Sequence, residues 1–173
     1  MHVPCGDKQV AFRVEHVTDE KAYLVAVNCI GKARMTDMYE YLDNFMKELP
    51  EDFINLCGEI EHKVNGHLIR RGKVALLSLG NTSGCKNCNG ADDMQFDGLR
   101  SEADRNKNDT NGETCWYWED TLYGYEDWDG DSSGFNYKSF FVVTPFGRSG
   151  DDRDGASVSL SVCPCLCILR NCK

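Results

Sequence analysis

The sequence predicts an α+β fold of small twisted antiparallel sheets, with one or two helices and long C-terminal loops. Strand-like alternation opens and closes the 173-residue chain, and one amphipathic segment lies between. These strands and short helices are interspersed without βαβ regularity, which favours α+β over α/β. We find no internal repeat or low-complexity linker, so residues 1–173 are predicted to form a single domain. Its three parts are an opening β-hairpin at 1–35, a helical segment at 36–58, and core strands with display loops at 114–173.

The opening hairpin rests on two short segments. Residues 10–17 (VAFRVEHV) alternate apolar and polar side chains, as a half-buried strand does, and residues 22–27 (AYLVAV) read as a more buried strand. Thr18-Asp19-Glu20-Lys21 between them is typical of a turn.

The helical segment begins with residues 36–46, where Thr36 is the expected N-cap. Apolar side chains recur there at the three-to-four spacing of a helix face that packs on a core. The stripe consists of Met38, Tyr41, Leu42, Phe45 and Met46. Pro50 ends this helix, and Glu51-Asp52 can start a second short one.

The middle of the chain is less regular. Asn65-Gly66 predicts a tight hairpin turn between short strands at 60–64 and 66–69. Residues 73–79 form an apolar run that predicts a buried strand, and 80–90 are expected to be loop. A weak helical interval follows at 94–104.

The last third combines aromatic and turn-forming residues. Residues 114–118 are expected to be a strand with at least one of Trp116 and Trp118 in the core. Residue patterns then predict a turn-rich stretch at 119–134, a strand at 138–144, a loop at 145–155, and a final strand pair or one long strand at 156–169.

The charge balance limits the partners. With 28 Asp and Glu against 19 Lys and Arg, the net charge of −9 argues against a nucleic-acid partner or an anionic membrane surface. We expect the basic cluster Arg70-Arg71-Lys73 to be solvated. No apolar run approaches the ~18 residues of a membrane span, so no membrane insertion is expected. The first residues lack the features of a signal peptide, which predicts synthesis in the cytoplasm.

Ten cysteines leave several interpretations open. We expect mostly free thiols that pack as small hydrophobes, including Cys163, Cys165 and Cys167, which alternate on one strand face. Cys85-Lys-Asn-Cys88 has the spacing of a zinc knuckle without a second ligand pair, so a loop pair of free cysteines is the favoured alternative.

Other sites are weakly indicated. Asp127, Asp129 and Asp131 alternate as the ligands of a calcium loop do, although a solvated acidic turn is the favoured interpretation. Calcium at these three residues is the one cofactor that the sequence suggests, and no other is expected. Nucleophile-elbow, P-loop and zinc-protease motifs are absent from the sequence, and the scattered histidines are expected to be solvated or structural. The sequence therefore predicts a protein that is not an enzyme.

Several collinear segments resemble the uncharacterised C-type-lectin-like domain family of phage and bacterial genomes. The family's "I-x-W-R-V-L", "L-R-x-W-L-N-x-x-F" and "V-x-L-L-S" patterns are similar to residues 10–17, 38–45 and 74–78. Its "W-W-L-R-S", "F-x-x-V-x-x-x-G" and "G-V-R-P-A-L-C-I" patterns are similar to residues 116–120, 140–147 and 161–168. The chain departs from these patterns where the family has two arginines, which are replaced near Glu119-Asp120 and at Cys163.

The resemblance implies a C-type-lectin-like fold, related to retroelement-diversified variable proteins, that displays a recognition surface from residues 127–137 and 147–161. Loops rich in Gly, Asp, Ser, Asn and aromatic residues suit that role. The predicted ligand-binding residues are Tyr123, Tyr125, Trp128, Phe135, Asn136, Tyr137, Arg148, Asp152 and Arg153. The implied function is a phage virion protein that binds a host-surface protein or glycan, with other virion proteins as partners and a homotrimer as a compatible assembly. The alternatives are a structural virion subunit, as a capsid decoration or tail-fibre component, and more remotely a cysteine-based oxidoreductase.

Overall fold

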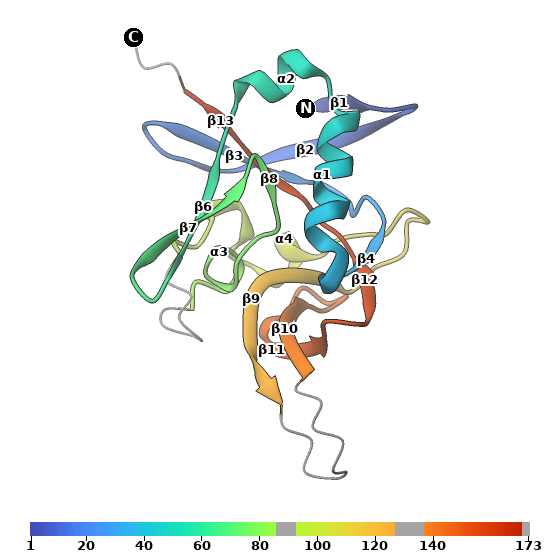
Figure 1. The fold of residues 1–173 in the computed structure, drawn as a ribbon, viewed down its shortest axis with the longest axis vertical. Coiled ribbons are helices and arrows are strands. Elements are labelled where there is room, and N and C mark those ends of the chain that lie inside the picture. Colours follow the sequence, from blue (N-terminus) through green and yellow to red (C-terminus); the bar gives the residue numbers. More distant parts are fainter. Residues whose placement is uncertain (86–92, 127–136, 171–173) are drawn as a thin grey trace.

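The computed structural model describes residues 1–85, 93–126 and 137–170, except for the side chains of 123–126, 137–139 and 151–153. It is a mixed α+β structure of mostly antiparallel, curled sheets with few helices, as the sequence predicts (Figure 1). The strands are β1 (His2–Cys5), β2 (Lys8–Val17), β3 (Lys21–Ala26), β4 (Lys32–Arg34), β5 (Cys57–Gly58), β6 (Ile60–Val64), β7 (His67–Gly72), β8 (Val74–Ala75), β9 (Tyr117–Glu126), β10 (Tyr137–Val143), β11 (Ser149–Gly155), β12 (Ser159–Ser161) and β13 (Cys165–Leu169). The helices are α1 (Met38–Glu48), α2 (Glu51–Leu56), α3 (Leu79–Ser83) and α4 (Glu102–Arg105), with 3-10 turns η1 (Met35–Asp37) and η2 (Asp97–Leu99).

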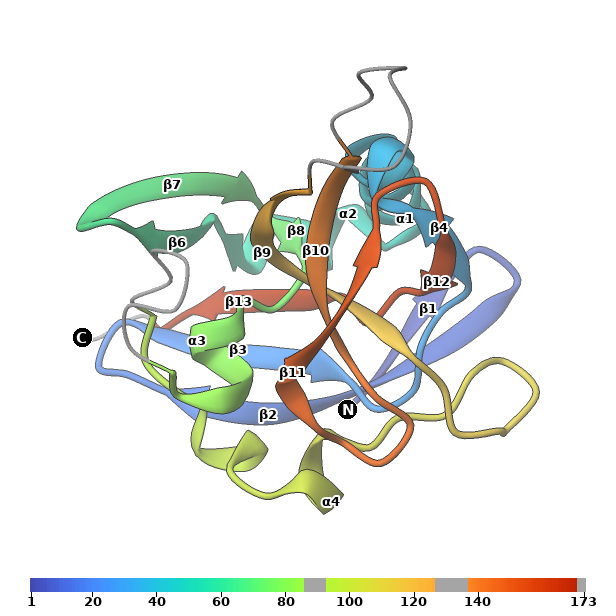
Figure 2. The same cartoon turned by 90° about the horizontal axis from the view of Figure 1, so that it is seen from below.

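The first sheet joins the two ends of the chain. Its strand order is β1-β2-β3-β13-β5, and β8 also pairs with β13. The predicted hairpin of β2 and β3 is confirmed, with the Thr18 N–H donating to the Lys21 carbonyl at 2.8 Å in its turn. β13 runs antiparallel to β3, so the last strand closes a sheet that the first strands begin (Figures 1 and 2).

Helix α1 packs on the core through the predicted stripe. Met38, Leu42 and Phe45 are buried, and Tyr41 and Met46 are half-buried against the same core. The predicted N-cap is wrong, because η1 occupies residues 35–37 and α1 starts only at Met38. The Thr36 hydroxyl instead donates to the Asp37 carboxylate at 3.0 Å, and no side chain caps the first turn of α1.

The middle of the chain confirms one prediction and corrects two. β6 and β7 form the predicted hairpin, and Asn65 and Gly66 in its turn have positive φ angles of 50° and 77°, as this turn type requires. Within the apolar run at 73–79 only β8 is a strand, although Leu76 and Leu77 are buried. The predicted loop that follows begins as α3, which a capping box between Ser78 and Asn81 starts.

The second sheet has the order β11-β10-β9-β12-β4. β12 pairs antiparallel with β4 and meets β9 through a single parallel bridge. Two predictions fail here: much of the turn-rich stretch at 119–134 is β9, and much of the loop at 145–155 is β11. Both strands carry polar residues that local patterns assign to turns, but backbone pairing with β10 holds them.

The cysteines largely follow the sequence prediction. Seven of them are free and buried in the described part of the chain: Cys5, Cys29, Cys57, Cys115, Cys163, Cys165 and Cys167. Cys85 is disulfide-bonded, so the expectation of a free thiol there is wrong. A sulfur in a disulfide offers no thiolate to a metal, which also argues against a zinc knuckle at this position.

Candidate binding ribbon and its buried base

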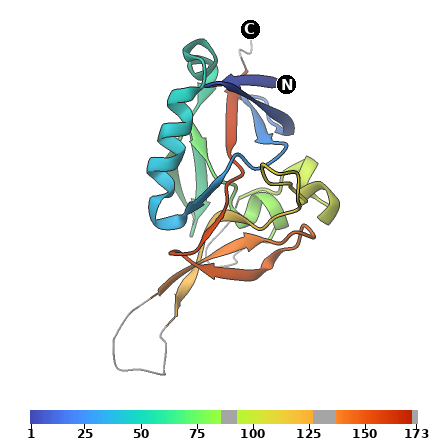
Figure 3. The same ribbon diagram turned by 90° about the vertical axis from the view of Figure 1, so that its right-hand side faces the viewer.

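Strands β9, β10 and β11 form a three-stranded antiparallel unit, called the ribbon below. Tyr137 of β10 pairs with Glu126 of β9, and Val142 pairs with Trp118. The register shifts twice between these pairs, and such irregularities increase the local twist of a hairpin. Figure 3 shows the paired ends of β9 and β10 leaving the body of the protein. The ribbon therefore has a buried base and a projecting end.

The structure places five of the predicted ligand-binding residues on the ribbon backbone. Tyr123 and Tyr125 belong to β9, Tyr137 starts β10, and Asp152 and Arg153 belong to β11. In the register, Tyr125 lies opposite Lys138, while Asp152 and Arg153 lie opposite Val142 and Phe141. The fold thus brings sequence-distant candidates onto three adjacent strands.

Other candidates lie outside the described residues. These are the aromatic and amide residues Trp128, Phe135 and Asn136 and the calcium candidates Asp127, Asp129 and Asp131. Their roles stay predictions. Within the part of the chain that the structure describes, no group of three or more His, Cys, Asp or Glu side chains is arranged to hold a metal ion.

Arg148 is separated from the projecting end. It lies in the turn between β10 and β11, where its backbone N–H donates to the Thr144 hydroxyl at 3.1 Å. Its side chain is 63% exposed, and its guanidinium lies 3.9 Å from the Glu102 carboxylate. Because β10 rises about 3.3 Å per residue over six steps, Arg148 is roughly 20 Å from Tyr137 along the strand. The structure therefore does not bring Arg148 together with Tyr137.

The base of the ribbon is anchored in the core by aromatic side chains. Tyr117 and Trp118 are fully buried, as are Val142 and Val143 of β10. The Trp118 indole N–H donates to the Ala33 carbonyl at 2.9 Å, and the Tyr117 hydroxyl donates to the Arg105 carbonyl at 2.8 Å. Trp116 is 43% exposed, so the expectation that at least one of these tryptophans is core is confirmed through Trp118.

A buried carboxyl group braces one face of the base. The hydroxyls of Thr82 on α3 and Ser149 on β11 both donate to one carboxyl oxygen of Glu119, the latter at 2.8 Å. The other carboxyl oxygen has no hydrogen-bond partner among the described residues. Burial raises the pKa of Glu119 to about 7, against the hydrogen bonds from the two hydroxyls. This side chain ties together α3, β9 and β11.

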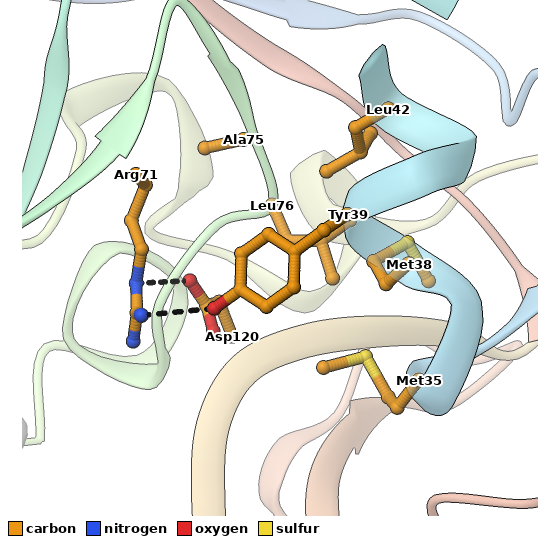
Figure 4. Close-up of a pocket in the computed structure, with 8 residues that line it drawn as sticks. All are labelled: Met35, Met38, Tyr39, Leu42, Arg71, Ala75, Leu76 and Asp120. Carbon is orange, nitrogen blue, oxygen red and sulfur yellow. Dashed lines mark hydrogen bonds and ion pairs between the residues drawn. The ribbon is translucent and has the colours of Figure 1, made fainter. Parts of the chain in front are cut away.

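A charged network braces the opposite face. The Arg71 guanidinium lies 2.6 Å from the Asp120 carboxylate and also donates to the Tyr39 hydroxyl at 3.1 Å (Figure 4). These groups line a pocket of about 20 Å³ beside the apolar side chains of α1. The expectation that the basic cluster is solvated is therefore wrong for Arg71, which is largely covered and paired. Burial raises the pKa of Asp120, partly offset by His62 and Arg71.

His62 extends this network into the interior. Its Nδ1 lies 3.3 Å from the Asp93 carboxylate, and its Nε2 lies 2.9 Å from the Leu76 carbonyl and 3.7 Å from Asp120. Both ring nitrogens thus face oxygen atoms of neighbouring groups. Burial alone would raise the pKa of Asp93, but hydrogen bonds from His62 and Ser78 outweigh it and lower the pKa.

Sequence reasoning missed these braces. Thr82 and Ser149 are 37 and 30 residues from Glu119, so no local spacing connects them. The one available signal is the adjacent pair Glu119-Asp120 inside an aromatic strand, at the position where the chain departs from the family pattern it resembles.

Known proteins give no guide to the function of this chain. The chain matches no protein-family model, no curated protein and no solved structure. Among the described residues, no helix has the length and apolarity needed to cross a bilayer. The structure defines an α+β protein whose projecting ribbon has a buried base held by polar contacts. Its outermost strand β11 is the edge of the sheet, where unpaired backbone groups can receive a partner.

Proposed function

We propose that this chain is a noncatalytic recognition protein that binds its ligand with the projecting end of the ribbon. The contrast between a fully buried base and an end that leaves the body carries this proposal (Figure 3). Binding is favoured when the contact residues are held by a rigid scaffold, because less conformational freedom is lost on association. The braces at Glu119 and Asp120 supply that rigidity from opposite faces of β9.

The finer assignment follows the family resemblance. We propose a C-type-lectin-like fold, supported by small curled antiparallel sheets, few helices, and a sheet that pairs the first strands with the last one. The proposed setting is a phage virion, with a host-surface protein or glycan as ligand and calcium as an optional cofactor at Asp127, Asp129 and Asp131. The residues proposed to contact the ligand at the projecting end are Tyr123, Tyr125, Trp128, Phe135, Asn136 and Tyr137. Asp152 and Arg153 pair with Val142 and Phe141, nearer the base of the ribbon, so they are left out of this surface.

The test is binding of the fluorescently labelled full chain to intact cells of candidate bacterial hosts, with and without a calcium chelator. We expect the double variant Trp128→Ala/Tyr137→Ala to lose binding about tenfold or more, since aromatic anchors dominate such surfaces. Its melting temperature should stay close to that of the wild type. Loss of wild-type binding with the chelator would support the calcium site.

Phe146→Ala is the matched control, because Phe146 is an exposed aromatic in the turn at the other end of β10. It should retain wild-type binding. Equal losses in both variants would contradict a contact surface confined to the projecting end. If no candidate host binds the wild type, a structural virion subunit replaces receptor recognition as the proposal, and co-assembly with virion proteins becomes its test.

A further inference from the structure

Three cysteines from distant parts of the chain meet in the core. Cys29 follows β3, Cys115 precedes β9, and Cys163 lies between β12 and β13. The sulfurs of Cys29 and Cys115 share a hydrogen bond at 3.6 Å, and the Cys163 thiol lies 3.5 Å from the Ala26 carbonyl. Hydrogen bonding from Cys29 is the largest cause that lowers the pKa of both Cys115 and Cys163. This group is called the thiol cluster below.

A buried lysine lies against the thiol cluster. The Lys107 ammonium is almost fully buried and donates to the Ala26 carbonyl at 2.9 Å, the same oxygen that faces Cys163. No described carboxylate lies within ion-pair distance of it. A buried ammonium is costly without a nearby negative charge, and a cysteine thiolate can provide one. Its charge is also among the causes that lower the pKa of Cys163.

Within the thiol cluster, Cys115 is the thiol that contacts Cys29 directly and has a lowered pKa. The hydrogen bond from Cys29 lowers its pKa to about 7, against the burial that raises it, and Ser161 and Lys32 add to the lowering. The nearby negative charge of Asp109 acts in the other direction and raises the pKa of Cys115. The pKa of Cys29 is raised by its hydrogen bonds to Cys115 and Cys163, so Cys29 keeps its proton. A thiolate beside a protonated thiol is the arrangement of a nucleophilic and a resolving cysteine.

A cavity reaches the thiol cluster at Cys29. It has a volume of about 640 Å³ and lies between the β1–β2 hairpin, α1 and the segment after β3, with Cys29 in its wall. Polar side chains, including Gln9, Asn28 and Thr110, line it together with apolar ones. Cys5 lines the same cavity, but burial and the adjacent Glu48 raise its pKa to about 11. One cavity therefore borders Cys29, whose sulfur lies 3.6 Å from that of Cys115, and also Cys5, whose raised pKa keeps it protonated.

We propose that Cys115 and Cys29 form a peroxide-reactive dithiol, a site independent of ligand binding by the ribbon. The Cys115 thiolate attacks one oxygen of hydrogen peroxide, the O–O bond breaks, and the released hydroxide takes a proton from solvent to give water. Cys29 sulfur then attacks the Cys115 sulfenic acid, the S–O bond breaks, and the leaving hydroxide takes the Cys29 proton. One peroxide is reduced to two waters while two thiols become one disulfide. The 3.6 Å sulfur separation must shorten by about 1.5 Å, within reach of side-chain rotation.

The experiment treats the folded full chain with stoichiometric hydrogen peroxide, blocks the remaining thiols, and maps disulfides by mass spectrometry. We expect a new Cys29–Cys115 disulfide that forms before Cys5, Cys165 or Cys167 is oxidised, and that dithiothreitol reverses. Cys115→Ser should slow oxidation of Cys29 by about tenfold or more, because the protonated thiol is a poor nucleophile. Cys29→Ser should trap Cys115 as sulfenic acid, detected with dimedone.

Cys5→Ser is the matched control, since it removes a thiol of the same cavity, and it should leave formation of the Cys29–Cys115 disulfide unchanged. Near-ultraviolet circular dichroism before treatment reports whether each variant is folded. The proposal is overturned if Cys5 is oxidised as fast as Cys115, if Cys29 joins Cys163 instead, or if the disulfide forms only in urea. These outcomes are independent of cell binding, so the site and the proposed recognition function are tested separately.

Discussion

Two neighbouring carboxyl groups at the base of β9 are stabilised in different ways. Glu119 faces α3 and β11, where hydroxyl groups contact it, and its pKa rises to about 7. Asp120 faces β7, where Arg71 lies 2.6 Å from it. Alternate residues of a strand point to opposite sides, so one dipeptide places an acid in each environment. One face is braced by a carboxyl group that favours its neutral form, and the other by paired charges.

The comparison shows how a polar strand can be buried on both sides. Hydroxyl groups can donate hydrogen bonds to a buried carboxyl group that has no counter-charge. Burial then disfavours the ionised form of that carboxyl group and raises its pKa. A guanidinium keeps the partner carboxylate charged, and loss of either group leaves the other uncompensated. The Glu119 face should therefore respond to pH, and the Asp120 face should respond to removal of its partner.

The largest effect should follow removal of the apolar base that both faces share. Trp118→Ala deletes a fully buried side chain and its hydrogen bond to Ala33. We expect the free energy of unfolding to fall by about 4 kcal/mol, as for other buried aromatic deletions. Urea unfolding measures it. Trp116→Ala, at a 43% exposed tryptophan two residues earlier, should cost much less, and equal losses would contradict the assigned core position.

The next largest effect on the free energy of unfolding should come from the titration of Glu119. The folded chain holds the Glu119 proton up to about pH 7, whereas the unfolded chain releases it near the ordinary value of 4.5. The contribution of Glu119 to the free energy of unfolding is thus fully present below pH 4.5. It falls by about 3 kcal/mol as the pH rises from 4.5 to 7. Glu119→Gln keeps the shape without the titration. Relative to the wild type, it should become more stable between pH 4.5 and 8 in urea unfolding, and a difference that does not change with pH would refute the assignment.

A smaller effect on the free energy of unfolding should follow removal of Arg71, the partner of Asp120. Arg71→Ala leaves the mostly buried Asp120 without its nearest cation, and we expect a loss of about 2 kcal/mol, reduced by the remaining solvent contact of both groups. Arg70→Ala is the neighbouring control, because Arg70 is 74% exposed and 3.4 Å from Glu59. Surface pairs of that kind contribute at most about 1 kcal/mol. Chemical unfolding of both variants at pH 7 compares them, and a larger loss for Arg70→Ala would contradict the burial difference.

The sequence by itself determined the elements whose signal is local. The α+β class, the opening hairpin, the Asn65-Gly66 turn and the apolar stripe of α1 follow from alternation, turn chemistry and helical spacing. The burial of most cysteines follows from the same kind of reasoning. For the predicted ligand-binding residues, the backbone shows strand neighbours for Tyr125, Tyr137 and Asp152, while their contact with a ligand stays a prediction.

Only the tertiary structure decided the rest. β9 and β11 read as turn-forming sequences because Glu119, Thr121 and Asp152 are polar, yet pairing with β10 makes them strands. Arg148 lies near the other candidates in sequence but at the far end of β10 in space. The Glu119 brace, the Arg71–Asp120 pair and the thiol cluster join residues 30 or more positions apart. Local patterns carry no record of such contacts, because long-range burial, rather than propensity, selects which polar groups and thiols meet.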